Sequence, residues 1–367
     1  MVSAREIDMR RIPAIGPLRA VAALLVLLSH VAFWTGAANV DGAGRLLARG
    51  DSGVAVFFAI SAFLLTRGYC AGRATPPDYA RRRVARIMPA YWLALVAVLG
   101  AAVMIDGTVG SLRQVLTHVF LLQGFTHESY RAFTQTWSLT TEVTFYVLVP
   151  VIGAWLLRRR AAGRTVPVVL VLVAAFGVLV QAFASSQGSP TWGWLGTSAL
   201  GHAAWFCVGI GWAWMLEQRP GIASRLTAGH ALLVAVLAYL VAATPLGGPI
   251  GLETPTVLAA AAKEILYGIV AGALLVAATN APREVQRRSS TGLALASGET
   301  SYGVFLWHLV VLQVLFASLG LRIFHAPFVL VLTVTLVVTW FLADASRRFV
   351  ERPAIRWGHR GAPRRTR

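Results

Sequence analysis

The chain has few charged residues for its length. Only 13% of its 367 residues are Asp, Glu, Lys or Arg, about half of the roughly 25% that a soluble domain carries. Hydrophobic residues make up 57%, and the mean hydropathy is +0.66. This composition excludes a soluble globular protein and predicts an integral membrane protein with several spans. Lysine is nearly absent, because Lys263 is the only lysine among 33 basic residues.

Cysteine is scarce as well. The two cysteines, Cys70 and Cys207, lie in or beside apolar segments, so neither a disulfide framework nor a metal cluster is expected. The formal net charge is nevertheless +18. This charge does not indicate a nucleic-acid-binding protein, because the arginines cluster in short loops between apolar runs.

Long apolar runs dominate the sequence. A run of about 20 residues can cross the ~30 Å hydrocarbon core of a bilayer as a helix, and the chain has ten such runs. They cover roughly residues 14–35, 52–71, 84–105, 136–157, 165–184, 196–216, 229–245, 256–279, 293–317 and 325–347. The shorter, mixed segment 111–125 is expected to form an interfacial or re-entrant helix. The predicted fold class is therefore all-α, a polytopic membrane protein with about ten transmembrane helices.

The basic residues give these spans an orientation. With a cytoplasmic N-terminus, the cytoplasmic segments hold 26 Lys and Arg residues and the external segments hold five. The positive-inside rule then places both termini in the cytoplasm, since one missed span would invert every later loop. Residues 1–350 are expected to form one transmembrane domain, and 351–367 a basic cytoplasmic tail. Arg5, Arg10 and Arg11 precede the first apolar run, which is interpreted as a retained signal anchor.

The first apolar run contains two ionisable residues, Arg19 and His30. They are eleven residues apart, which is about three helical turns and roughly 16 Å, so both side chains point to the same side. Ionisable residues at such depth usually face the interior of a helix bundle and mark a functional site. The alternative is an arginine that snorkels to the interface and a histidine hydrogen-bonded to a neighbouring helix.

Two further ionisable residues are expected at about the depth of His30. Glu142 lies two turns below the external end of its span, and His308 lies near the middle of its span. Buried imidazole and carboxylate groups suit general acid–base catalysis. The alternative for Glu142 is a structural ion pair, or a carboxylate favoured by the helix N-terminus. For the adjacent Lys263 and Glu264, which point to different faces, a structural role is favoured.

A group of arginines lies where the third span begins on the cytoplasmic side. Arg83 and Arg86 are three residues apart and share a helix face, and guanidinium groups bind phosphates bidentately. The pair is therefore a candidate phosphate site. The alternative is an ordinary basic loop of the kind that the positive-inside rule requires.

Two other polar or aromatic residues are less specific candidates. Ser61 is a lone hydroxyl in an apolar helix without a nucleophile-elbow context, so packing between helices is favoured for it. Trp137 begins an aromatic-rich segment at the start of the fourth span. The alternative to a role in the site is that Trp137 belongs to the interfacial aromatic belt.

Taken in order, these motifs resemble the acyltransferase 3 family of bacterial membrane O-acyltransferases. The similar blocks are Leu18-Arg19-Ala20 followed by His30, Gly53 to Leu64, Arg82-Arg83-x-x-Arg86-Ile-x-Pro89, Trp137-Ser-Leu-x-x-Glu142-x-x-Phe145-Tyr146, Ser301-Tyr302 to His308, and Glu351-x-Pro353. Two positions depart from the family pattern. Gly16-Pro17 replace an Asp-Gly pair, and Ala62 replaces the glycine after Ser61. Each block is weak alone, but six in the right order are specific.

The resemblance implies an enzyme of the bacterial cytoplasmic membrane that transfers an acyl group, usually acetyl from acetyl-CoA. The acceptor would be a hydroxyl of a carbohydrate, a glycolipid or a glycosylated small molecule. His30 would be the catalytic base, and Glu142 would support the site. The arginines that would contact the phosphates of acyl-CoA or line its path are Arg19, Arg83 and Arg86. The remaining candidate site residues are Ser61, Trp137, Tyr302 and His308, and no metal is expected.

Other classes of protein share some of these features. A flippase or transporter of glycolipid or polysaccharide intermediates would also need a polar core, but the internal repeats and broken helices typical of transporters are not evident in the sequence. A membrane-embedded binding or sensor protein would tolerate substitution of Arg83 and Arg86. Within the acyltransferase hypothesis, direct transfer to the acceptor is favoured over a covalent acyl-histidine.

Overall fold

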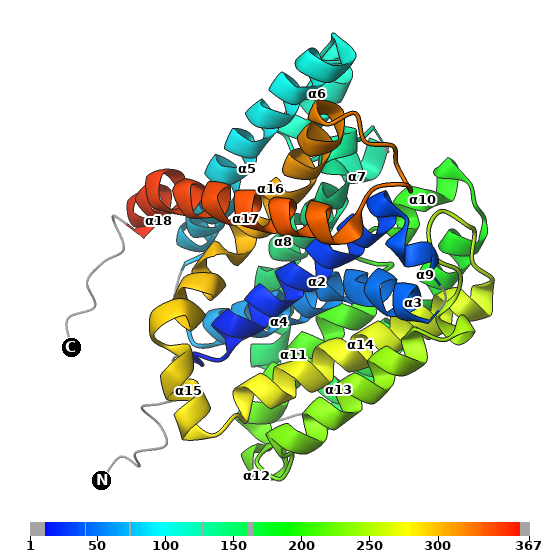
Figure 1. Cartoon of the computed structure of the whole chain (residues 1–367). Coiled ribbons are helices and arrows are strands. Elements are labelled where there is room, and N and C mark those ends of the chain that lie inside the picture. Colours follow the sequence, from blue (N-terminus) through cyan, green and yellow to red (C-terminus); the bar gives the residue numbers. More distant parts are fainter. Residues whose placement is uncertain (1–11, 41, 73–74, 127, 160–163, 360–367) are drawn as a thin grey trace.

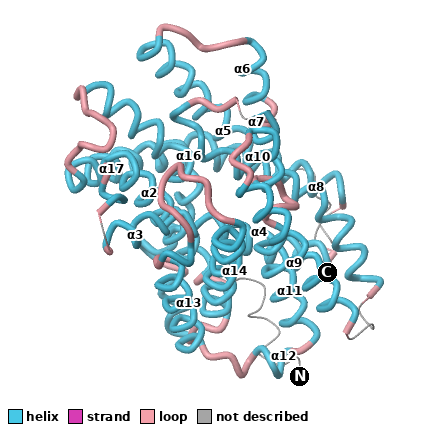
Figure 2. The backbone as a smooth tube through the Cα atoms, turned by 90° about the vertical axis from the view of Figure 1, so that its right-hand side faces the viewer, coloured by secondary structure: helices cyan, strands magenta, loops and turns pink. Residues whose placement is uncertain are grey.

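The computed structural model describes residues 12–40, 42–72, 75–126, 128–159 and 164–359 of the chain. Within these ranges the protein is a bundle of helices without a strand (Figures 1 and 2). The ten main helices are α2 (Ile15–Thr35), α4 (Gly53–Cys70), α5 (Pro76–Asp106), α8 (Trp137–Arg158), α9 (Thr165–Ser186), α11 (Ala203–Gln218), α13 (Ala228–Ala242), α14 (Val257–Thr279), α16 (Gly292–Ser318) and α17 (Phe328–Ser346). The short helices that connect or extend them are α3 (Ala43–Ala48), α6 (Leu112–Val119), α7 (Gln123–Thr126), α10 (Pro190–Gly196), α12 (Pro220–Ala223), α15 (Arg283–Ser289) and α18 (Arg352–His359).

Each of the ten predicted spans corresponds to one of the ten main helices. Eight of the helical segments are long and apolar enough to cross a membrane, whereas α11 and α13 are shorter, with 16 and 15 residues. The prediction of an all-α polytopic membrane protein is confirmed. Arg5, Arg10, Arg11 and residues 360–367 of the predicted tail lie outside the described part of the chain.

Local sequence decides where the helices begin and end. The Thr75 side chain caps the first turn of α5, and Pro76 occupies its first position, where the fixed φ of proline suits a helix. The helix therefore begins at Pro76 and not at the predicted residue 84, so the arginines of residues 81–86 lie on the helix. Helix α2 ends at a glycine. Gly36 directly follows it and adopts φ 85°, the left-handed conformation that commonly terminates helices.

The centre of the bundle is α16. Buried residues make up 78% of its most apolar stretch, and it packs against α2, α5 and α17. The corresponding share is 17% for α9 and 22% for the segment that contains α17. These peripheral helices expose apolar side chains over much of their surface, as expected of helices that border lipid.

The helix ends define two ends of the bundle. The start of α2, the start of α5, α15 and α18 lie on the left in Figure 1, whereas α3 and α10 lie on the right. We call the first end the arginine-rich end, because Arg81, Arg82, Arg83 and Arg86 lie on the first turns of α5. The predicted orientation puts this end in the cytoplasm.

The segment predicted as an interfacial or re-entrant helix, 111–125, forms the two short helices α6 and α7. Its His118 is fully buried and its ring packs against Tyr130 and Phe133. Burial lowers the pKa of this imidazole, because desolvation disfavours the charged form. His118 therefore serves as a neutral packing residue, and it joins α6 to Tyr130 and to Phe133 of η3 (Arg131–Thr136).

The packing of α11 against α4 depends on a glycine. A Cβ atom added at Gly209 would lie 2.1 Å from the carbonyl oxygen of Ala59, which is shorter than any van der Waals contact. Small residues allow helices in a membrane to approach this closely. At Gly211 on the same helix, an added Cβ would meet only Leu170 Cδ1, at 3.7 Å.

We therefore expect Gly209→Ala to destabilise the protein and Gly211→Ala to leave its stability unchanged. Overpacking of this kind costs about 1–3 kcal/mol. The measurement is the melting temperature of each variant in the same detergent. Equal melting temperatures for the two variants would contradict the close packing of α11 on α4.

Candidate active site

Six of the predicted site residues line one small cavity. This inner cavity has a volume of about 90 Å³ and lies between α2, α4, α5, α8 and α16. Its predicted members are Arg19, Ser61, Arg83, Arg86, Glu142 and Tyr302. They come from five helices, so only the tertiary fold brings them together.

Glu142 is the hydrogen-bond acceptor at the centre of the inner cavity. The Ser61 hydroxyl donates to Oε1 of Glu142, and the Tyr146 hydroxyl donates to the same oxygen at 2.6 Å. The Arg83 guanidinium carbon lies 6.0 Å from the centroid of the Tyr146 ring, within the range of a cation–π contact. The hydroxyl of Ser61 thus fixes Glu142, in addition to any packing role.

Arg86 connects the inner cavity to the arginine-rich end. Its Nη1 lies 3.8 Å from Oε2 of Glu351, and its guanidinium carbon lies 6.0 Å from the ring centroid of Tyr302. Arg19 and Arg86 also line a second hollow of about 570 Å³, the mouth, which includes residues from the start of α2 and from α16. The mouth and the inner cavity therefore meet at these two arginines.

His30 and His308 lie outside the inner cavity and contact each other. His308 Nε2 is 3.3 Å from His30 Nδ1. His30 Nδ1 also lies 2.8 Å from the Val26 carbonyl oxygen, and His308 Nδ1 lies 3.1 Å from that of Val304.

These contacts assign the protons of both rings. A carbonyl oxygen can only accept a hydrogen bond, so each neutral imidazole carries its proton on Nδ1. The Nδ1–H of His30 then donates to both Val26 and His308, and its Nε2 keeps a lone pair. His308 is fully buried, whereas His30 is only partly buried. The His30 ring is therefore positioned by His308 and the backbone.

The partly exposed His30 lines a second cavity. This outer cavity has a volume of about 540 Å³ and is bordered by the loop between α13 and α14. Its other polar and aromatic members include Asp51, Gln135, Trp137, His202, Lys263, Glu264 and Tyr267. Val54 lines both the inner and the outer cavity, so the arginines lie on one side of Val54 and His30 lies on the other.

Asp51 is a site residue that the sequence did not reveal. Its carboxylate accepts hydrogen bonds from Lys263 Nζ at 2.7 Å and from the Tyr267 hydroxyl. The available signal was its position two residues before the Gly53 block. Glu264, the residue after Lys263, pairs with His202 Nδ1 at 3.1 Å.

In the described ranges, no group of three or more His, Cys, Asp or Glu side chains is placed to hold a metal ion.

The sequence placed His30, Glu142 and His308 in one layer. The structure brings the two histidines together, but Glu142 faces the inner cavity with the arginines. Depth along a span does not decide which face of the helix a side chain occupies, and this explains the difference.

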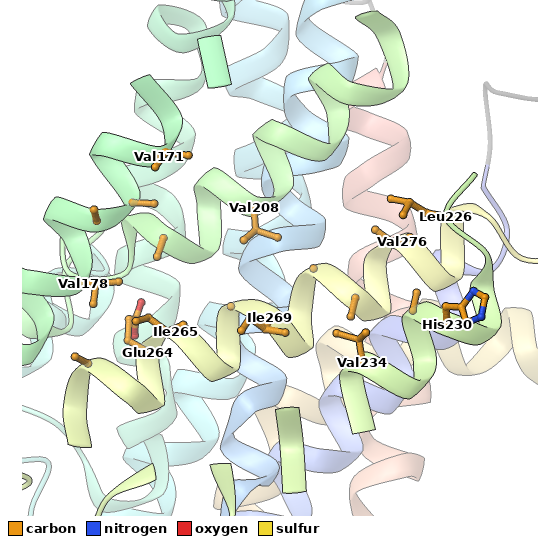
Figure 3. A pocket seen from close by; sticks show the side chains of 18 of the residues that line it. Val171, Val178, Val208, Leu226, His230, Val234, Glu264, Ile265, Ile269 and Val276 are labelled. Carbon is orange, nitrogen blue, oxygen red and sulfur yellow. The ribbon is translucent and has the colours of Figure 1, made fainter. Parts of the chain in front are cut away.

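A further hollow shares only Glu264 with the cavities described above. It is an apolar groove of about 960 Å³ over α11 and α14, between α9 and α13 (Figure 3). Figure 3 shows Val208 and Ile269 along it, with His230 near one end and Glu264 near the other. Apart from a few polar residues such as these two, its walls are aliphatic and lie among peripheral helices, so we assign it to the lipid-facing surface and not to the active site.

A comparison with known families identifies the domain that contains these cavities. The sequence model of the acyltransferase 3 family, described as an acyltransferase domain, matches residues 12–344. This chain belongs to the acyltransferase 3 family. The matched range contains every member of the inner and outer cavities. The resemblance seen in the sequence is thereby confirmed, and the chain carries an acyltransferase domain.

Three curated proteins are similar to this acyltransferase 3 chain. "Exopolysaccharide production protein ExoZ" of Rhizobium meliloti (strain 1021) is 32% identical over 32% of the chain and 42% of its own length. "Nodulation protein 10" of Rhizobium leguminosarum bv. viciae is 31% identical over 45% of the chain and 49% of its own length. "Putative peptidoglycan O-acetyltransferase YrhL" of Bacillus subtilis (strain 168) is 24% identical over 97% of the chain and 57% of its own length. The chain spans about half the length of these relatives, and no solved structure matches it.

Proposed function

We propose that this chain transfers an acetyl group from acetyl-CoA to a hydroxyl of a carbohydrate-containing acceptor at the bacterial cytoplasmic membrane. The observation that carries the proposal is the meeting of two cavities at Val54, one lined by arginines and one lined by His30. The positive-inside rule assigns the arginine-rich end to the cytoplasm, which is where CoA is found. The donor then enters from one end and the acceptor from the other.

The arginines suit the donor. Acetyl-CoA is a polyanion, and guanidinium groups bind phosphates with two parallel hydrogen bonds. Its pantetheine arm would pass Arg19 and Arg86 from the mouth into the inner cavity. Arg19 and His30 are roughly 16 Å apart along α2, about the reach of that arm. Glu142, fixed by Ser61 and Tyr146, balances part of the positive charge along this path.

The histidines suit the chemistry. The lone pair on His30 Nε2 removes the proton of the acceptor hydroxyl while the hydroxyl oxygen attacks the thioester carbonyl carbon. The carbon–sulfur bond then breaks, and the CoA thiolate takes the proton back from His30. The positive charge that His30 carries between these steps is stabilised through Nδ1–H by the Val26 carbonyl and His308 Nε2. The direct route needs no acyl-enzyme.

The outer cavity suits a sugar. It combines hydrogen-bonding groups such as Asp51 and Gln135 with the indole rings of Trp137 and Trp205, and both kinds of group contact carbohydrates well. The names of two relatives refer to an exopolysaccharide and to peptidoglycan. These names support a carbohydrate acceptor for this chain.

Mass spectrometry of polar lipids and exported glycans from a deletion strain tests the proposed function. We expect one class of glycan or glycolipid to lose an acetyl group, and to regain it on complementation with the wild-type gene but not with His30→Ala. Unchanged acetylation in the deletion strain would contradict the proposal.

Purified protein should also be stabilised against heat by CoA, because a ligand that binds only the native state raises the melting temperature. A flippase would show no such response.

A further inference from the structure

A second arginine cluster borders the proposed donor site. A hollow of about 480 Å³, the arginine hollow, lies beside the segment in which α17 continues into α18. Its lining residues are Arg86, Glu299, Arg347, Arg348, Glu351, Arg352, Ile355 and Arg356. Five of these eight residues are arginines and two are glutamates, so the hollow is net positive. Arg86 also lines the inner cavity, so the two spaces meet at this residue.

A π-helical turn builds one wall of the arginine hollow. Helix α17 continues through η5 (Arg347–Glu351), a π-helix, into α18. A π turn places residues five apart above one another. Arg347 and Arg352, which are five apart, accordingly bind the same oxygen of Glu299, each at 2.7 Å. Such turns inside α-helices are frequent at functional sites.

The wall is held in place by α5. Arg81 Nε donates to the Gly358 carbonyl oxygen at 3.1 Å. An added Cβ at Gly358 would lie 2.6 Å from the Cβ of Ala85, so glycine allows α18 to approach α5 closely. The ion pair between Arg86 and Glu351, whose side chain is 1% exposed, joins the same two segments from inside. The arginine hollow is therefore bounded by packed helices.

Several of the guanidinium groups remain available to a ligand. Arg348 pairs with Asp344 and Arg352 pairs with Glu299, but their side chains are 61% and 52% exposed. Arg356 is exposed and has no hydrogen bond or ion pair to another residue of the described ranges. A ligand with several negative charges would neutralise this surplus.

We propose that the arginine hollow binds the phosphorylated nucleotide of the acyl-CoA donor. Arg348 and Arg356 would contact its phosphates, and Arg86 would lie where the pantetheine arm turns into the inner cavity. CoA carries a pyrophosphate and a ribose 3′-phosphate, and charge-assisted bidentate contacts to arginine suit both groups. The volume lies within the range of about 300–1,000 Å³ that is typical of small-molecule pockets. This inference rests on the proposed function, because it assumes an acyl-CoA donor and assigns the nucleotide part of that donor to the arginine hollow.

The test compares two donors in one variant. S-acetylpantetheine has the same thioester arm as acetyl-CoA but lacks the nucleotide and its phosphates. For Arg348→Gln/Arg356→Gln we expect the KM for acetyl-CoA to rise about tenfold, the effect of losing roughly one charge-assisted contact. The kcat with acetyl-CoA and the rate with S-acetylpantetheine should stay unchanged. The Kd of CoA for the purified variant, measured by calorimetry without turnover, should rise by the same factor.

A matched control is available at the same end of the bundle. Arg287 and Arg288 are exposed, pair with Glu284, and do not line the arginine hollow. Arg287→Gln/Arg288→Gln should therefore leave the KM for acetyl-CoA and the Kd of CoA unchanged. The melting temperature of each variant is measured as well, so that a loss of fold is distinguished from a loss of CoA binding.

Three outcomes would overturn the inference. One is an unchanged Kd and KM for the coenzyme in Arg348→Gln/Arg356→Gln. Another is an equal loss of rate with both donors, which would indicate a structural role. The third is a loss of rate that appears only in vesicles with anionic lipid, which would assign the arginines to lipid headgroups. If the wild-type protein neither binds CoA nor uses either donor, the proposed function itself fails.

Discussion

His30→Ala is expected to lower the rate of acyl transfer by about 10²–10⁴-fold, the usual contribution of a general base. The substitution removes the only nitrogen that we assign to take the acceptor proton. The Kd of CoA should stay unchanged, because His30 lies in the outer cavity and the arginines lie on the far side of Val54. Rates of CoA release with acceptor present, together with CoA calorimetry, measure both quantities.

Two other histidines sharpen the test of His30. His308→Gln should lower the rate of acyl transfer less than His30→Ala does. It alters the acceptor that His308 Nε2 provides, but the Val26 carbonyl still orients the His30 ring. His230→Ala should have no effect, since His230 is exposed on α13, its ring bonds to Thr227, and it lines neither the inner nor the outer cavity. A folded His30→Ala protein that transfers acyl groups at the wild-type rate would refute the assigned mechanism.

Val54→Trp is expected to stop transfer while leaving donor binding intact. Val54 is the residue that lines both cavities, so an indole at this position would separate the thioester from the acceptor hydroxyl. A misplacement of about 1 Å can already cost roughly 100-fold in rate, and the blocked path should cost at least as much. CoA-dependent thermal stabilisation should persist, because Arg19, Arg83 and Arg86 are unchanged.

Val54→Ala provides the control for the blocked passage. It shortens the side chain that lines both cavities and adds no barrier between them, so substantial transfer activity should remain. Both variants need a melting temperature near that of the wild-type protein, since Val54 is partly buried among the core helices. Wild-type turnover in Val54→Trp would show that the acyl group does not pass between these cavities at Val54.

The helices follow from the sequence more directly than their boundaries. An apolar run of about 20 residues has one stable solution in lipid, a helix that satisfies its own backbone, and each predicted span has its helix. The start of α5 was placed too late because arginines interrupt the apolar pattern at residues 81–86. The capping signal of Thr75 and Pro76 was a better guide there than hydropathy.

The candidate site follows from the sequence only in part. The ionisable residues inside apolar runs stood out, and His30 and His308, which were expected only at a similar depth, are in contact. Which residues share a cavity depends on how the helices rotate against one another, and the spans carry no strong amphipathic pattern that would fix this rotation. Similar depth did not reveal that Glu142 lines the inner cavity while His30 lines the outer one, and Asp51, just ahead of α4, was not found.

The small volume of the inner cavity bears on which thioesters the protein accepts. At about 90 Å³ it has room for only a few water molecules. A two-carbon acyl group fits such a space, whereas a fatty acyl chain would have to displace the packed rings of Phe57, Phe58 and Phe305 around it. We therefore expect the rings that pack the helices together here to select short acyl groups over fatty acyl chains.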